Sequence, residues 1–183
     1  MLTIRQEKTS DAAASEALLD AAYGPVRFEK PSERLRAGRS PARGLSLVAV
    51  EDGRVVGTVR LWQVAAGATR QALLLGPLAV DSACRNRGIG SALMRRALHE
   101  AGRRGHGAVL LVGDAAYYGR FGFAAERSRG LWLPGLADRN RLLGCELTAG
   151  ALDGARGAIR APSRPAKAPP IAAIGALSAP RAA

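Results

Sequence analysis

The sequence is poor in cysteine and in long apolar runs, and each shortage excludes a class of protein. Only Cys84 and Cys145 are present, neither has a second Cys or a His at metal-ligand spacing, and so no zinc site or disulfide framework is indicated. Before residue 154 the longest uncharged apolar run is residues 72–80, well short of the about 20 residues that a membrane span needs. The first residues lack the basic-then-apolar order of a secretory signal. We therefore expect a cytoplasmic protein with no metal and no membrane partner.

Aromatic side chains are also scarce, although the chain is strongly basic. It has 27 Lys and Arg against 15 Asp and Glu, a net charge of +12, and only 4% aromatic residues. All but three of the cations are arginine, and Ala and Gly are abundant, which is typical of a GC-rich genome. Proteins that bind single-stranded nucleic acid usually combine basic grooves with aromatic side chains, and no recognisable nucleic-acid motif is present. A nucleic-acid partner is therefore not expected.

The length of 183 residues fits one folded domain followed by a tail. Hydrophobic residues make up 48% of the chain, which is enough to form a buried core. From residue 154 to the end there are five cations, no acidic residue and five of the ten prolines. Such a segment buries too little surface to offset the entropy of ordering it. We predict a domain over residues 1–153 and a flexible Pro-, Ala- and Arg-rich tail over residues 154–183.

Strand and helix patterns alternate along the predicted domain. Strands are expected at 3–5, 45–50, 54–64, 71–81 and 108–112, with two late strands near 124–133 and 141–147. Helices are expected at about 11–22, from residue 31 onward, at 88–103 and at 115–120. Asp52-Gly53 between two β-rich runs favours a hairpin, because both turn positions need positive φ. A strand, a helix and a strand within about 40 residues indicate a parallel pair, and hence a mixed α/β sheet.

The turn after the fourth expected strand has the composition of a phosphate site. It leads into a helix, and a helix N-terminus carries unpaired N–H groups and partial positive charge. Gly88 and Gly90 let the main chain approach an anion closely, Arg85 and Arg87 can add charge-assisted hydrogen bonds, and Ser91 offers a hydroxyl. The sequence therefore predicts a phosphate or pyrophosphate group at this turn. The alternative is a turn that is tight for structural reasons alone.

Two better-known phosphate motifs do not match this turn. The dinucleotide pattern G-x-G-x-x-G requires a third glycine where this chain has Leu93, and it requires an acidic residue about 20 positions later. A P-loop requires Gly-Lys-Ser or Gly-Lys-Thr, which the sequence lacks.

The order Arg85-x-x-Gly88-x-Gly90 resembles the R/Q-x-x-G-x-G/A signature of the GNAT superfamily of acetyl-CoA-dependent N-acetyltransferases. Residues 75–81 are similar to the central strand of that superfamily, and residues 117–123 are similar to its next helix and turn. The resemblance covers roughly residues 2–147 and points to a bacterial branch of predicted acetyltransferases.

The resemblance implies a GNAT-like mixed, mostly antiparallel sheet with a central splayed parallel strand pair and flanking helices. The pantetheine arm of acetyl-CoA, the expected cosubstrate, would lie in the gap and pair with the main chain of Leu78, Ala79 and Val80. Pro77 lacks an N–H, which agrees with a bulge in this strand. The pyrophosphate would be held by the main chain of Arg85, Asn86, Arg87, Gly88, Ile89, Gly90 and Ser91.

Transfer of an acetyl group to an amine also needs a proton donor and a proton acceptor. In the family pattern the second aromatic of the Tyr117-Tyr118 pair points toward the sulfur, which implies Tyr118 as the acid and Tyr117 as packing. The alternative is that both tyrosines only pack against the sheet. Asp114 is the favoured base among Glu33, Asp81 and Asp114, although it can equally cap the following helix, and a water relay would need no single base.

The segments around Arg27, Phe28, Glu33 and Trp132 correspond to those that shape the acceptor site in this fold, and simple packing explains Phe28 and Trp132 equally well. The expected function is direct transfer of an acetyl group from acetyl-CoA to an amine of a small molecule or peptide. The alternative is a non-catalytic acyl-CoA-binding regulatory module. Neither the acceptor nor the oligomeric state follows from the sequence, and a homodimer is compatible with it.

Overall fold

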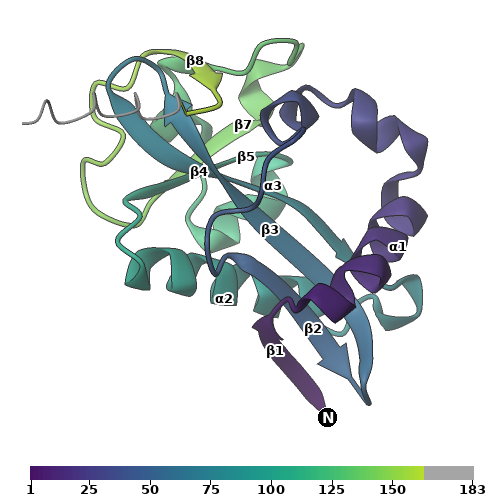
Figure 1. Ribbon diagram of the computed structural model, residues 1–183. Helices are drawn as coiled ribbons and strands as arrows, with labels where there is room; N and C mark the ends of the chain where they lie inside the picture. The colour runs from purple at the N-terminus through teal and green to yellow at the C-terminus, as the bar shows by residue number, and fades with distance from the viewer. Residues whose placement is uncertain (163–183) are drawn as a thin grey trace, which may run out of the picture.

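The structure, a computed structural model, describes residues 1–162. It is built around an eight-stranded sheet with the order β1-β2-β3-β4-β5-β7, to which β6 and β8 attach at one end (Figure 1). The strands are β1 (Leu2–Gln6), β2 (Ser46–Glu51), β3 (Arg54–Ala66), β4 (Arg70–Val80), β5 (Ala108–Val112), β6 (Leu131–Trp132), β7 (Leu142–Glu146) and β8 (Gly157–Arg160). The helices are α1 (Ala12–Tyr23), α2 (Ile89–Arg103) and α3 (Ala115–Tyr118), with 3-10 turns that include η2 (Pro25–Glu29), η3 (Pro31–Leu35) and η4 (Ser82–Cys84).

The pairing of the strands confirms the predicted mixed sheet. Along the main path every pair is antiparallel except β4 with β5. The β2–β3 hairpin turns at Asp52 and Gly53, whose φ angles of 48° and 78° match the expected turn. Residues 1–5 and 45–66 therefore form the antiparallel meander that the alternating sequence pattern predicts.

The parallel pair separates soon after it forms, as the family resemblance implied. Only Leu73 with Val109 and Leu74 with Leu110 are in register, so the rest of β4 faces a gap on its β5 side. One extra residue of β4 is accommodated opposite β3, where the register changes from Leu61↔Leu75 to Val59↔Leu78. The bulge contains Gly76 and Pro77, in agreement with the expected strand irregularity.

The two faces of the sheet are covered by different helices (Figure 1). Helix α2 packs its apolar stripe, including Ile89, Leu93 and Met94, on the face that carries Leu61 and Leu73. Helix α1 crosses the opposite face of β3 and β4. Most of the buried apolar side chains come from the strands of the sheet and from α2. This packing fixes the end of β4 relative to the start of α2.

Two sequence predictions about the last part of the chain are corrected. The expected strand at 124–133 is reduced to Leu131–Trp132 and an isolated bridge at Ala124, because the hydroxyl of Ser128 stabilises a 3-10 turn by bonding to Ala125 O. The folded part also continues past residue 153: β8 pairs with β3 and buries Ala158 and Ile159. A short apolar segment inside a polar, proline-rich stretch explains the misplaced boundary. The remainder of the predicted tail, from residue 163, lies outside the described residues.

None of the helices in residues 1–162 has the length and apolar character that crossing a bilayer requires.

Candidate active site

Two adjoining hollows open at the gap between β4 and β5. The first, here called the groove, lies at the start of α2 and is lined by Leu78, Val80, Arg85, Gly88 and neighbouring residues. The second, here called the cavity, is about 280 Å³ and lies between the bulge of β4, η3 and β5. Tyr23 and Leu78 line both hollows, so an extended ligand can pass from one to the other.

The groove has the geometry of an anion site at its α2 end. Gly88 caps the helix with a left-handed φ of 76°, and a Cβ placed there would meet no atom within 4 Å. The side chain of Ile89 is buried in the core, so this residue offers the groove only its main chain. Gly90 is closely covered instead, since a Cβ there would lie 3.7 Å from the hydroxyl of Tyr117. The open main chain at the positive end of a 15-residue helix can receive a phosphate group.

The two arginines predicted to assist this turn have different surroundings. Arg85 is exposed and lines the groove. The guanidinium of Arg87 instead forms a two-pronged pair with Glu51 of β2, at 2.6 and 2.8 Å. This pair lies outside the groove and lowers the pKa of Glu51. The prediction that the Arg87 side chain assists an anion is therefore not supported, because a carboxylate 36 positions earlier already occupies its fork.

A second cation of the groove, Arg120, was not predicted from the sequence. Its guanidinium lies 4.3 Å from the centroid of the Tyr117 ring, and its Nε donates a hydrogen bond to Tyr117 O at 2.9 Å. Arg120 lines the groove together with Tyr117. Its place within the tyrosine-containing segment 117–123 was the available signal, but nothing in the sequence distinguishes it from the other arginines.

The main chain of β4 alternates between β3 and the gap. Asp81 N donates to Val56 O at 2.9 Å, so by the antiparallel alternation Ala79 also faces β3. The N–H groups of Leu78 and Val80 and the C=O of Val80 then face the gap, while Leu78 O accepts a hydrogen bond from the hydroxyl of Tyr23. The main chain of Ala79 is directed to the neighbouring strand, so of the three residues predicted to pair with pantetheine only Leu78 and Val80 have N–H groups that face the gap.

The two tyrosines of the predicted pair face different hollows. Their rings are edge to face, with centroids 4.9 Å apart, and Tyr117 lines the groove while Tyr118 lines the cavity. Burial raises the pKa of Tyr118 to about 12, so its hydroxyl is protonated at neutral pH. Tyr118 therefore offers the cavity a protonated hydroxyl.

A further tyrosine, Tyr23, was missed by the sequence analysis. It is the last residue of α1, and its hydroxyl donates a hydrogen bond to Leu78 O. Burial raises its pKa, and the ammonium of Lys30 lies 3.9 Å from its ring centroid. The Gly24-Pro25 pair marked the end of this helix, but only the packing of α1 across β4 brings its last side chain to the site.

Of the three carboxylates considered as bases, only Glu33 lines the cavity. Asp114 caps α3 by accepting a hydrogen bond from Ala116 N at 3.0 Å, and it lines neither hollow. Asp81 caps η4 and pairs with Arg54 at 2.6 Å. The capping alternative for Asp114 is therefore the one that the structure adopts, because the residue precedes a helix whose first N–H groups need an acceptor.

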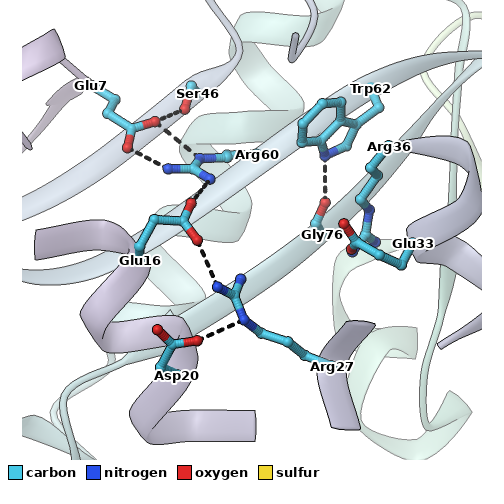
Figure 2. A network of polar contacts seen from close by, with 10 residues as sticks. All are labelled: Glu7, Glu16, Asp20, Arg27, Glu33, Arg36, Ser46, Arg60, Trp62 and Gly76. Carbon is cyan, nitrogen blue, oxygen red and sulfur yellow. Dashed lines mark hydrogen bonds and ion pairs between the residues drawn. The ribbon is translucent and has the colours of Figure 1, made fainter. Parts of the chain in front are cut away.

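An ion-pair chain holds the η2 segment to the sheet (Figure 2). Arg60 of β3 binds Glu7 at 2.7 Å and Glu16 at 2.6 Å, and Arg27 of η2 binds Glu16 at 2.7 Å and Asp20 at 2.9 Å. Arg27 also borders the cavity, so its charge is balanced there by two carboxylates of α1. These ion pairs hold η2, which forms the wall of the cavity before η3, against α1 and β3.

The two aromatic residues considered for the acceptor site lie elsewhere. Phe28 is exposed beside Arg27, and Trp132 is exposed beside Arg139. Neither lines the groove or the cavity. Within residues 1–162 no group of three His, Cys, Asp or Glu side chains is arranged to hold a metal ion.

Comparison with known proteins agrees with this geometry. Residues 13–123 match the model of the acetyltransferase (GNAT) family. The uncharacterized N-acetyltransferase YhbS of Escherichia coli K12 is 35% identical over 124 residues, which cover 67% of this chain and 73% of that protein.

Solved structures show the same fold. The crystal structure of E. coli YhbS in complex with CoA has a TM-score of 0.74 and 30% identity, and the match covers 87% of this chain and 89% of that one. A GNAT family acetyltransferase from Brucella melitensis in complex with acetyl-CoA has a TM-score of 0.67 and 28% identity, with 89% and 97% covered. The predicted fold class and family are confirmed, and this chain belongs to the GNAT family of N-acetyltransferases.

Proposed function

We propose that this protein transfers an acetyl group from acetyl-CoA directly to an amine that enters the cavity. The observation that carries the proposal is that the groove at the start of α2 and the cavity that holds the protonated Tyr118 share Leu78 of β4 in their lining. The complexes of the two related proteins with CoA and acetyl-CoA support the choice of cosubstrate.

The residues of the groove fit the pyrophosphate of coenzyme A. Gly88 leaves open space above the first N–H groups of α2, where a side chain would obstruct an anion. Arg85 and Arg120 line the same groove and add positive charge to it. Together the helix end and the two guanidinium groups replace the water that a diphosphate loses on binding.

The main chain of β4 positions the thioester. The N–H groups of Leu78 and Val80 face the gap, where they can pair with an extended pantetheine arm and hydrogen-bond the thioester oxygen. Donors held in place for the negative charge that develops on this oxygen typically contribute a few kcal/mol of transition-state stabilisation each. Tyr23 orients this part of β4 through its bond to Leu78 O.

Acetyl-CoA supplies an activated acetyl group, and the residues of this chain manage the protons of its transfer. The acceptor nitrogen forms a bond to the acetyl carbon, the carbon–sulfur bond breaks, and the sulfur leaves with the electron pair. Tyr118 donates the proton that the departing sulfur needs. Glu33, the carboxylate of the cavity, accepts the proton that the amine loses.

Two measurements test the proposal. Calorimetry should detect acetyl-CoA binding, and an assay for released coenzyme A thiol across a panel of amines should detect turnover. Binding that Gly88→Ala weakens, together with turnover above the hydrolysis background, would support transfer. Binding without turnover for any amine would instead favour a non-catalytic acyl-CoA-binding module, and absence of binding would reject the groove assignment.

A further inference from the structure

The cavity has an excess of positive charge that the acetyl-transfer chemistry does not explain. Four cations line it, Arg27, Lys30, Arg36 and Arg141, against the single carboxylate of Glu33. Arg27 is already balanced by two carboxylates of α1. The remaining three cations and one anion leave the cavity with a net charge of about +2.

Arg36 is the most constrained of these cations. Its side chain is only 9% exposed, and its Nε atom has no hydrogen-bond partner in the described part of the chain. Glu33 lies 3.6 Å from Nη1, which is longer than a hydrogen bond, and burial lowers the pKa of Arg36 to about 10 (Figure 2). A buried guanidinium with unused donors is costly unless a ligand completes its bonding.

The position of Arg36 places this donor beside the reacting groups. Its Nη2 lies 3.2 Å from where a Cβ on Gly76 would be, so the guanidinium lies on the bulge of β4. The indole of Trp62 holds the same bulge by donating to Gly76 O at 2.8 Å. The guanidinium is therefore fixed close to the strand that positions the thioester, on the cavity side.

Lys30 and Arg141 are exposed and belong to the same cavity. Both Arg36 and Arg141 lower the pKa of Lys30, in addition to burial, so Lys30 lies close enough to each of them for their charges to repel. Cations that share one cavity are stabilised by an anion bound among them. They would repel an acceptor that carries only positive charge.

We propose that the acceptor carries a negatively charged oxyacid group, a carboxylate or a phosphate, near its amine, and that this group binds Arg36 with Lys30 and Arg141 around it. The inference rests on the proposed acetyl transfer. A planar guanidinium can bind the two oxygens of such a group at once, whereas Lys30 and Arg141 contribute attraction at the opening. Polyamines and other purely cationic amines are accordingly poor acceptors.

The same charges assist the chemistry of the amine. Nearby cations disfavour the protonated form of an amine and lower its pKa, so a larger fraction is neutral and able to attack. Binding of the oxyacid group offsets the repulsion between the cations of the cavity and the amine. Because more of the bound amine is then already neutral, Glu33 has to remove a proton from a smaller fraction of it. Binding and deprotonation of the acceptor thus depend on the same cluster.

Matched amine pairs test the proposal in the full-length protein. β-Alanine is compared with its amide, phosphoethanolamine with ethanolamine, and spermidine serves as a cationic amine. We expect kcat/KM for at least one anionic member to exceed that of its neutral partner about tenfold or more, a preference of the size that one well-placed ion pair supplies. The carboxylate and phosphate arms then show which oxyacid is preferred.

Variants assign the preference to the cluster. The acid-to-neutral ratio is kcat/KM for an anionic amine divided by kcat/KM for its neutral partner. Arg36→Met and the exposed Arg141→Met should each reduce this ratio, mainly by raising KM for the anionic amine, while Arg36→Lys should retain part of it. Arg103→Met, which changes an exposed arginine of α2 far from the cavity lining, is the matched control and should leave the ratio unchanged. Because Arg141 is exposed, its variant remains informative if Arg36→Met does not fold.

A binding measurement separates failure of this inference from failure of the proposed function. Protein saturated with coenzyme A, so that the groove is filled, is titrated with inorganic phosphate and with propionate in the wild type and in Arg141→Met. Anion binding that the variant weakens supports the proposal even if none of the amines is acetylated. No anion binding, or faster turnover of neutral or cationic amines, overturns it, whereas failure to bind coenzyme A at all rejects the proposed function.

Discussion

The ring of Tyr118 lies directly against the main chain of Gly113: a Cβ added at Gly113 would come within 2.2 Å of Tyr118 Cε2. Gly113 follows the last residue of β5, so this contact sets the direction in which the phenol enters the cavity. The absence of a side chain at residue 113 is thus a condition for the placement of the candidate acid.

Substitution Gly113→Ala should therefore disturb catalysis by moving Tyr118. The added methyl cannot be accommodated at 2.2 Å, so the ring must shift, and we expect kcat to fall about tenfold or more while acetyl-CoA affinity changes little. Gly102→Ala in α2 is the control, because a Cβ there meets no other atom within 4 Å and should leave turnover unchanged. Equal turnover of both variants would show that the orientation of Tyr118 is unimportant.

Removing the hydroxyl of Tyr118 tests its chemical role. Tyr118→Phe keeps the ring but lacks the proton donor, so kcat should fall at least about tenfold with the dissociation constant of acetyl-CoA unchanged. Tyr117→Phe is the matched variant, since its hydroxyl lies in the groove, and we expect its kcat to remain within about threefold of the wild type. Steady-state rates and calorimetry measure both effects. An unchanged rate in Tyr118→Phe would remove the acid from the mechanism.

Gly88 and Gly53 permit a comparison of backbone strain with anion binding. They have similar φ angles of 76° and 78°, and a Cβ at either would meet no atom within 4 Å. Each Gly→Ala change should cost about 1–2 kcal/mol of unfolding free energy, because a side chain disfavours this left-handed conformation. Only Gly88→Ala should also weaken coenzyme A binding, by about fivefold or more, since the methyl covers the N–H groups of α2. Equal affinities in the two variants would contradict the phosphate assignment.

The pair between Arg5 and Asp11 predicts a pH-dependent contribution to stability. Hydrogen bonds from Arg5, at 2.6 and 3.0 Å, and from Lys8 N lower the pKa of Asp11 to about 2 from its ordinary 3.8. Because the folded-state pKa is the lower one, the stabilisation is complete above about pH 4 and is lost as the pH falls toward 2. Urea unfolding should therefore show Asp11→Asn less stable than the wild type at pH 7, with the difference disappearing near pH 2. A difference that stayed constant with pH would exclude this linkage.

Some site residues could be predicted because local chain geometry determines what they do. The apolar segment 71–81 followed by Gly88 and Gly90 indicated a strand, a turn and a helix, and the structure has these three elements in that order. Asp114 was harder, since a residue before a helix can cap it or line a cavity, and the sequence supports both. The ion pair of Arg87 was not predicted, because its partner, Glu51, is far away in the chain.

By itself the sequence determined the features that depend on neighbouring residues: the hairpin at Asp52-Gly53, the helix start at Gly88, and the family that these patterns resemble. The tertiary structure alone decided that Tyr23 at the end of α1 and Arg36 just after η3 meet β4 at or next to its bulge. The physical reason is that backbone conformation follows from local sterics and hydrogen bonding. Convergence of charges and phenols instead depends on how helices and strands pack over a splayed sheet, which no spacing along the chain records.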